Sequence, residues 1–292
     1  MYFANCHCHS TFSDGMLTPD ELCEVALREG YRAVILTDHD TCRGSYFMNV
    51  AARKRGLLNI ADTEFYAVGY GSEYHILGFD YNPDNKDMKE MLLRASSRAT
   101  IKCKFLFDEG ILRGTLREGI SWQDVLDAFP YNDYICNNQV FEVMISRGIY
   151  ERSEYFTEFL RPNFGTKVAR SYGTALTSLL PEIPHAEIVC STIRKAGGVP
   201  VVAHPHNKLP YVNDLLAAGA MGFEICHPSM TSEERAYFDT LCTEKNLYKM
   251  GGTDHSGALS GLCDIEPERK CEKSDGFVTE ENFMLLCERR LG

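Results

Sequence analysis

The chain has 292 residues, of which 44% are hydrophobic, so it can form a folded domain with a sizeable core. Its formal net charge of −11 argues against a protein that coats nucleic acid, because such proteins need a broad basic face. The start, MYFANCHCHS, lacks the pattern of a secretory signal, and no run of about 18 apolar residues occurs. We therefore expect a cytoplasmic protein outside the membrane, with its 12 Cys mostly reduced core thiols.

Short apolar runs alternate with amphipathic segments, which is the pattern of an α/β protein. The expected strands span residues 2–8, 33–37, 58–64, 74–79, 199–203, 222–225 and 248–251. A helix is expected from Thr18, which forms a capping box with Glu21, to the terminating Gly30. A second capping pair, Thr231 with Glu234, predicts the start of another helix.

Residues 82–184 interrupt this alternation. The segments with a helical pattern there are DMKEMLLRASSRATIKCKFLFDEG, SWQDVLDAF, NQVFEVMISRG and SEYFTEFL, and no strongly periodic strand is visible. The simplest account is a barrel built from residues 1–81 and 185–292, with residues 82–184 inserted between two of its strands as a mainly helical cap subdomain.

The stretch NCHCHSTFSDG near the start carries the first sign of chemistry. Residues two apart in a strand point to the same face, so His7 and His9 face one way and Cys6 and Cys8 face the other. Asp14 follows in a Ser-Asp-Gly turn. Two imidazoles beside a carboxylate are the donors expected of a metal site.

Further polar residues lie next to the other predicted strands, and the C-terminal ends of parallel strands meet at one rim. They are Asp38, His39, Asp40, Glu64, His75, His204, His206, His227, Asp254 and His255. Taken singly, each histidine can be an ordinary hydrogen-bonded residue, and the TDHD segment can be a turn with helix-capping aspartates. Taken together, they indicate a site for several metal ions.

The set HCHSTFSDG, ILTDHDT, a Glu at position 64, a following His, AHP and GGTD resembles the PHP (polymerase and histidinol phosphatase) family. The resemblance covers residues 1–81 and 186–261. It implies a distorted (β/α)7 barrel with two or three divalent metal ions at its C-terminal rim. The helical insertion and the run IRKAGGVPVVAHP resemble the branch that removes phosphate from nucleotides or small phosphoesters.

The resemblance also implies which residues hold the metals. The first ion would take His7, His9, Glu64 and Asp254, the second Asp14 and His39, and the third Glu64, His75 and His204. One departure concerns the last motif, which in the family usually ends Asp-x-His, whereas this chain has Asp254-His255-Ser256. Either His255 completes the second site through a shifted loop, which we favour, or that position takes water and His255 points at substrate.

A donor set of imidazoles and carboxylates without thiolate suits Zn, Mn or Fe. Metal ions about 3.5–4 Å apart can share a hydroxide at neutral pH, and that hydroxide can attack phosphorus. We therefore expect Glu64 and Asp254 to be catalytic through the metals. His206 can bind phosphate or protonate the leaving oxygen, or it can simply pack in its loop.

Arg94, Arg98 and Lys102 are spaced i, i+4 and i+8, so they lie along one helix face. This face is either a solvated basic stripe or a clamp for the substrate phosphate. Where nucleotide-cleaving relatives carry Arg-Pro-His, this chain has Asn137 and Asn138. The expected substrate-binding residues are Arg94, Arg98, Asn138, His206 and His227.

The expected function is a metal-dependent phosphoesterase for a small phosphorylated metabolite, first a nucleoside monophosphate or 3',5'-bisphosphate. The shared hydroxide would attack phosphorus, and no extended nucleic-acid surface is expected. The alternatives are a histidinol-phosphatase-like monoesterase, a metal-assisted amide or lactone hydrolase on the same barrel, and a nuclease-like module that serves a polymerase. The natural substrate, the physiological metal and the oligomeric state do not follow from the sequence.

Overall fold

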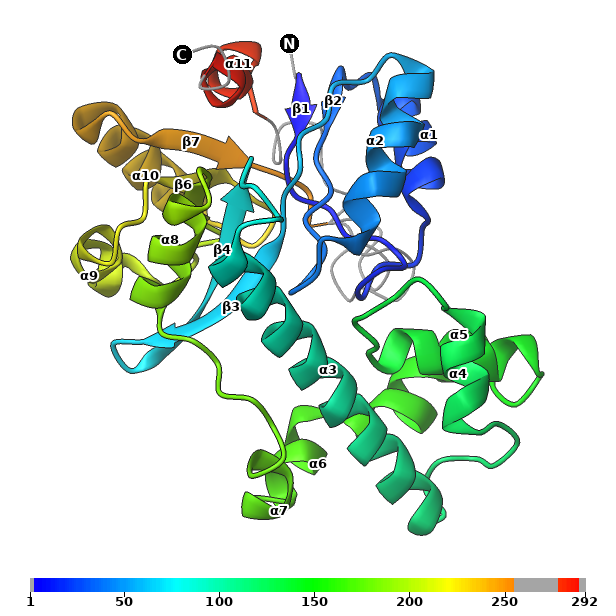
Figure 1. The fold of residues 1–292 in the computed structure, drawn as a ribbon. Coiled ribbons are helices and arrows are strands. Elements are labelled where there is room, and N and C mark those ends of the chain that lie inside the picture. Colours follow the sequence, from blue (N-terminus) through cyan, green and yellow to red (C-terminus); the bar gives the residue numbers. More distant parts are fainter. Residues whose placement is uncertain (1–2, 255–277, 289–292) are drawn as a thin grey trace.

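The computed structural model describes residues 3–254 and 278–288, and it shows the expected α/β organisation (Figure 1). The strands form two sheets. The smaller sheet contains β1 (Ala4–Asn5) and β2 (Ala33–Val34). The larger sheet has the order β3 (Glu64–Gly69), β4 (Ser72–Phe79), β5 (Val199–Val202), β6 (Gly222–Cys226) and β7 (Tyr248–Gly251).

The expectation of parallel strands is wrong for β4. It pairs antiparallel with both β3 and β5, whereas β5, β6 and β7 are mutually parallel. The reason is local, because only Tyr70 and Gly71 separate β3 from β4, and both have positive φ, 51° and 78°. Such a two-residue turn makes a hairpin, while a parallel pair needs a long crossover.

The predicted strand 58–64 is also wrong, because β3 begins only at Glu64. The segment before it makes single backbone hydrogen bonds, from Val34 N to Leu58 O (3.0 Å) and from Gly78 N to Thr63 O (2.9 Å). The carboxylate of Asp62 also competes with strand pairing, because Thr63 N donates to Asp62 Oδ1 (2.5 Å) and not to a neighbouring strand. A regular ladder therefore does not form, although the segment lies between β2 and β4.

Backbone hydrogen bonds also join β7 to the chain that follows β1. Cys6 N donates to Gly251 O (3.1 Å) and Asp254 N donates to His7 O (2.9 Å). The two sheets are thus linked on both sides, and this brings the residues after β1, β2 and β7 together.

The helices follow the sequence signals closely. α1 (Pro19–Glu29) has the Thr18–Glu21 capping box and ends at Gly30, and α10 (Ser232–Lys245) starts with Thr231 and Glu234 as predicted. The other helices of the sheet region are α2 (Arg43–Arg55), α8 (Ala186–Lys195), η3 (Leu209–Tyr211), α9 (Val212–Ala217) and α11 (Glu280–Glu288).

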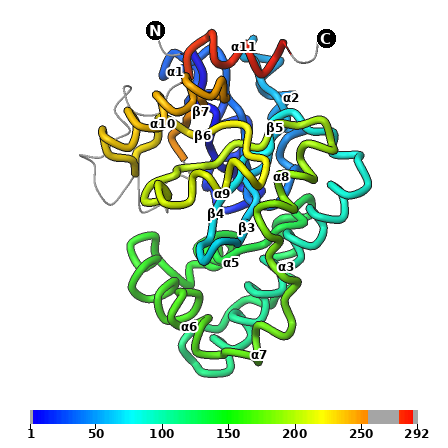
Figure 2. Tube along the Cα trace, turned by 90° about the vertical axis from the view of Figure 1, so that its left-hand side faces the viewer, coloured from blue at the N-terminus to red at the C-terminus, as the bar shows by residue number. Residues whose placement is uncertain are grey.

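Residues 82–184, all of which the structure describes, contain helices and no strand. They are α3 (Lys86–Leu112), α4 (Trp122–Ala128), α5 (Asn137–Ser146), η1 (Arg152–Glu154), the π-helix η2 (Tyr155–Phe164), α6 (Thr166–Ser171) and α7 (Thr174–Thr177). α3 leads away from the sheets, and α4 to α7 gather at that end of the molecule (Figures 1 and 2). α3, α4, α5, η2 and α6 share a hydrophobic cluster of their own, which includes Phe107, Phe141 and Phe159.

Cys6 and Cys8 point away from His7 and His9, as the strand alternation predicts. Cys6 packs among core residues of the strands, and Cys8 packs in the cluster beneath α1 and α2. Both cysteines are free thiols. None of the helices in the described part of the chain has the length and apolar character that crossing a bilayer requires.

Candidate metal centre

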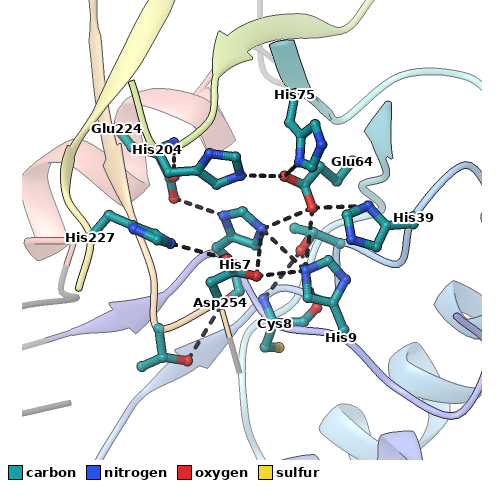
Figure 3. A network of polar contacts seen from close by, with 12 residues as sticks. His7, Cys8, His9, His39, Glu64, His75, His204, Glu224, His227 and Asp254 are labelled. Carbon is teal, nitrogen blue, oxygen red and sulfur yellow. Dashed lines mark hydrogen bonds and ion pairs between the residues drawn. The ribbon is translucent and has the colours of Figure 1, made fainter. Parts of the chain in front are cut away.

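The candidate centre is a cluster of imidazoles and carboxylates (Figure 3). His7 and His9 follow β1, Asp254 follows β7, and Glu64 is the first residue of β3. One nitrogen or oxygen atom from each of these four residues lies within 4.8 Å of the others. The three residues other than Asp254 are buried. The predicted ligands of the first metal are therefore close together in space.

Glu64 occupies the middle of the cluster, and its two carboxylate oxygens face five imidazoles. Its side chain is fully buried, with 0% exposed. Oε2 lies 3.1 Å from His7 Nε2, 3.3 Å from His9 Nε2 and 3.2 Å from His39 Nδ1. Oε1 lies 2.8 Å from His75 Nδ1 and 2.9 Å from His204 Nε2. Each of the two oxygens thus faces its own set of imidazoles, as a ligand shared between ions would.

Asp254 closes the other side of the cluster. Its Oδ1 lies 3.0 Å from His9 Nε2 and its Oδ2 lies 3.2 Å from His227 Nε2. His227, which we expected at the substrate, is buried and packs against this carboxylate. The structure therefore places His227 inside the cluster.

The protonation pattern of His7 shows why this arrangement suits a cation. Its Nδ1 lies 3.0 Å from Glu224 Oε1, and because a carboxylate only accepts, Nδ1 carries the proton. In a neutral imidazole Nε2 is then a lone pair, yet it faces Glu64 Oε2 and His9 Nε2 at 3.1 and 3.2 Å. Acceptors at these distances repel one another unless a proton or a metal cation lies between them.

Buried polar atoms without hydrogen-bond partners also indicate a bound cation. The buried Nδ1 atoms of His9 and His39 and Oε2 of Glu64 have no hydrogen-bond partner among the described residues. Buried polar atoms normally find partners, so orphans at one place indicate an absent group. The residues fit divalent Zn, Mn or Fe, since all the donors are imidazoles and carboxylates.

The electrostatics differ among these donors. Burial would lower the pKa of His7, His9 and His204, but the nearby carboxylates outweigh it and raise the pKa of each, so a metal ion must displace protons from these rings. Burial alone would raise the pKa of Glu64, but the imidazoles of His7, His39 and His75 outweigh it and hold that pKa well below its usual range. Burial also dominates at His39, where it lowers the pKa to about 4 despite the nearby carboxylates. Near pH 7 the protein therefore presents an ionised Glu64 and a neutral His39, as metal ligation requires.

Comparison with known proteins gives the family. A family model described as the PHP domain matches residues 5–122. The 5'-3' exoribonuclease Rnm of Salmonella typhimurium is 32% identical over 269 residues, which cover 85% of this chain and 83% of that protein. The chain belongs to the PHP family.

Two further relatives match over similar lengths. A 5'-3' exoribonuclease of Haemophilus influenzae is 25% identical over 259 residues, covering 85% of this chain and 88% of that protein. A 3',5'-nucleoside bisphosphate phosphatase of Chromobacterium violaceum is 23% identical over 274 residues, covering 89% of each chain. The fold matches a solved structure from Bifidobacterium adolescentis, described as a metal-dependent phosphoesterase, with a TM-score of 0.75, 24% identity and coverage of 99% and 96%. The family resemblance and the enzyme class, a hydrolase of phosphate esters, are confirmed.

Asp14 and His39 lie at the edge of the PHP cluster. Asp14 Oδ2 is 3.7 Å from His39 Nε2, and its Oδ1 is 3.7 Å from His9 Nδ1. The pair predicted for the second metal is thus accompanied by His9. His255, the predicted completing ligand, lies outside the described residues, so its role remains a prediction.

Side-chain amides of α5 hold the loop that carries Asp14. Gln139 Nε2 donates to Thr11 O at 3.1 Å and to Ser13 O, and Asn138 Nδ2 donates to Asp14 O. Both amide side chains are buried. The helices of residues 86–177 therefore help to fix the position of Asp14, and Asn138, expected at the substrate, is bonded to the protein itself.

We expect Gln139→Ala to loosen this loop. The change removes one donor from Thr11 O and one from Ser13 O, and it leaves the backbone N–H of Cys136 without its Gln139 acceptor. A buried group left unsatisfied in this way costs about 1–3 kcal/mol. Thermal unfolding should show the loss of stability, and metal analysis should show weaker binding of one ion. Gln123→Ala is the matched control, because Gln123 is an exposed amide on α4 whose Nε2 donates to Asp127 of its own helix. Equal effects of the two changes would argue against the role of Gln139.

Glu224 on β6 is a residue of this PHP site that the sequence reasoning missed. Its carboxylate is fully buried, accepts from His7 Nδ1 at 3.0 Å and accepts from the backbone N of His204 at 2.5 Å. It therefore fixes the ring of His7 and the end of β5 together. The available signal was a glutamate inside the apolar strand GFEIC, because a charge rarely occupies such a position without a partner.

His206 is held by a second glutamate. Its Nδ1 lies 2.9 Å from Glu234 Oε2, and its Nε2 lies 2.6 Å from Asn207 Nδ2. Burial works against the charge on Glu234, but hydrogen bonds from Asn207 N, His206 and Thr231 N lower its pKa to about 2. Glu234 thus stays ionised and orients His206, whose side chain is 40% exposed.

The three residues of the predicted phosphate clamp differ in their surroundings. Arg98 donates from Nη1 to Pro181 O and is half-buried, while Arg94 and Lys102 are exposed on the same helix. Burial lowers the pKa of Arg98, and the charges of Asp40 and Glu73 oppose that shift. Glu73 also acts on Lys102, so Arg98 differs from the other members of the stripe by its contact with Pro181 O and by the charge of Asp40.

Proposed function

We propose that this PHP protein hydrolyses a phosphate ester of a nucleotide, first a nucleoside monophosphate or 3',5'-bisphosphate, on a distorted (β/α)7 barrel with a helical cap formed by residues 82–184. The observation that carries the proposal is the buried Glu64, whose carboxylate faces five imidazoles. The named nucleotide phosphatase and exoribonucleases among the relatives support the substrate class.

The residues proposed to hold two or three divalent ions are His7, His9, Asp14, His39, Glu64, His75, His204 and Asp254, with His255 as the predicted completion. When bound, the ions would lower the pKa of a water molecule and neutralise negative charge on the phosphate. Glu64 would orient the imidazoles around it, since its two oxygens already separate them into two groups.

The remaining roles are proposed for residues of α3 and of the segment that follows β5. We propose that Arg98, and Arg94 one turn before it, bind a phosphate oxygen, because guanidinium groups make strong charge-assisted hydrogen bonds. His206, oriented by Glu234 at Nδ1, would hold or donate a proton at Nε2 once the leaving oxygen replaces the Asn207 amide at that atom. Asn138 is proposed to act through the Asp14 loop rather than on the substrate.

A second candidate is stepwise 5'-3' hydrolysis of short RNA, favoured by the 32% identity to the exoribonuclease Rnm. Assays of phosphorylated metabolites and short oligoribonucleotides with added manganese separate the two. The nucleotide proposal predicts turnover of nucleoside phosphates, whereas turnover of oligoribonucleotides alone would favour the second candidate.

Arg98→Glu distinguishes phosphate from carbonyl substrates. If Arg98 binds phosphate, kcat/KM should fall about 10- to 100-fold, the value of one or two charge-assisted hydrogen bonds. An amide or lactone hydrolase has no need of this charge and should be spared. Unchanged phosphatase activity in the variant would remove Arg98 from the proposal.

A further inference from the structure

Three aromatic side chains form an exposed patch, here called the α2 patch, which consists of Tyr46, Phe47 and Tyr131. Their exposed fractions are 70%, 37% and 69%. The ring of Phe47 lies 5.5 Å from that of Tyr46 and 5.7 Å from that of Tyr131, and it stacks on the buried Phe12 at 5.1 Å. Adjacent exposed rings on a folded surface usually mark a binding site.

The α2 patch lies beside the loop between His9 and Asp14, two residues of the candidate metal centre. Phe12, beneath the patch, lies between His9 and Asp14 in the chain. The first turn of α2 packs on the same loop so closely that a Cβ on Gly44 would lie 2.5 Å from Asp38 Oδ2 and 3.2 Å from the Phe12 ring. On the other side, Asn132, next to Tyr131, donates to Thr11 O at 2.7 Å. The rings therefore lie beside the loop that carries two predicted metal ligands.

Charge around the patch favours an anion. α2 carries four cations and no acidic residue, although the chain as a whole has a net charge of −11. Arg43, Tyr46, Phe47, Val50 and Arg53 are exposed at helical spacing, so cations flank the rings along one face. Asp133 pairs with Arg43 at 3.1 Å and takes up part of its charge. Arg55 on the same helix is paired with Asp20 and Glu24, and it contributes nothing to this face.

Aromatic rings beside cations bind nucleobases, because every base offers a flat face for stacking while the cation meets a phosphate. We propose that Tyr46, Phe47 and Tyr131 stack against the nucleobase of a substrate whose phosphate lies at the Glu64 cluster. The inference rests on the proposed function, and it restricts the substrates of that function to phosphate esters that carry a nucleobase. A second copy of the chain is a poorer occupant, since it would bring another −11 charges to the same place.

The first test compares substrates with and without a base. For Tyr46→Ala and Tyr131→Ala, kcat/KM on a nucleoside 3',5'-bisphosphate should fall about 10- to 100-fold, and on ribose 5-phosphate by clearly less. Tyr46→Phe should restore most of the loss, because stacking needs the ring alone. Tyr237→Ala on α10, which removes a ring that is 44% exposed, is the matched control and should change neither value. Equal losses on both substrates, or no loss, would overturn the proposal.

The second test separates this inference from the proposed function. Adenosine and ribose are titrated against the wild type and Tyr46→Ala by calorimetry, which needs no hydrolysis. Adenosine binding that Tyr46→Ala weakens, together with no phosphatase activity, would refute the proposed function and keep the base site. Adenosine binding equal to that of ribose would overturn the base site. So would sedimentation that shows a wild-type dimer converted to monomer by Tyr46→Ala with kcat/KM unchanged.

Discussion

Replacing Glu64 with Ala is expected to lower kcat/KM by about 1,000-fold or more and to release more than one metal ion from each chain. The physical reason is the position of the carboxylate, which faces five imidazoles with both oxygens. A ligand shared between ions supports several kcal/mol of charge stabilisation, and each 1.4 kcal/mol corresponds to about tenfold in rate.

Glu64→Gln sharpens this prediction because it keeps the size of the side chain and removes the charge. We expect it to resemble Glu64→Ala in metal content while folding more stably. Glu187→Gln on α8 is a suitable control, since this glutamate is 67% exposed and should bind no metal. A loss of less than about tenfold in Glu64→Ala would mean that the carboxylate does not bridge ions.

Glu224→Ala is expected to weaken metal binding by about 10- to 100-fold, the usual cost of removing a group that orients a metal-binding imidazole. Without Glu224, the Nδ1 proton of His7 loses its acceptor, so the ring can turn or change tautomer. The backbone N of His204 also loses its acceptor. Titration of the metal-free variant with manganese, followed by calorimetry, measures the change directly.

The conservative change Glu224→Gln separates orientation from bulk. An amide has one oxygen, so it can accept from His7 or from His204 N, but it places an N–H against the other donor. We expect an intermediate loss of metal affinity and a shifted ¹⁵N signal for the His7 ring. If both variants bound manganese like the wild type, Glu224 would have only a structural role in the core.

Much of the site was predictable because its signals are local. The spacing of His7 and His9 sets their common face, and the caps of α1 and α10 depend on residues three apart, Thr18 with Glu21 and Thr231 with Glu234. These features need only the geometry of an extended segment or of one helical turn, and the alternation of His7 and His9 holds although β1 ends at Asn5. The structure accordingly reproduces them.

The errors came from interactions between distant parts of the chain. Residues 58–63 read as a strand, but Asp62 binds the backbone of Thr63 and the regular ladder starts at Glu64. The antiparallel direction of β4 depends on positive φ at Tyr70, a residue that does not usually mark a turn. Glu224 gave only a weak signal, because its partners His7 and His204 lie far away in the sequence.

The role of Asn138 could not be predicted from the sequence either. In the sequence it stands where relatives place a charged segment, which suggested a contact with substrate. In the structure its Nδ2 donates to Asp14 O and its Oδ1 accepts from Tyr155 at 2.6 Å. A polar residue near a site can therefore support a ligand loop instead of binding the substrate, and only the fold distinguishes the two.

The most direct test of the account is metal analysis of purified, active protein, combined with anomalous X-ray diffraction of its crystals. We predict more than one equivalent of Zn, Mn or Fe per chain, with anomalous peaks beside Glu64, and loss of activity when a chelator removes them. Full activity in protein that contains no metal, or metal peaks away from Glu64, would contradict the account.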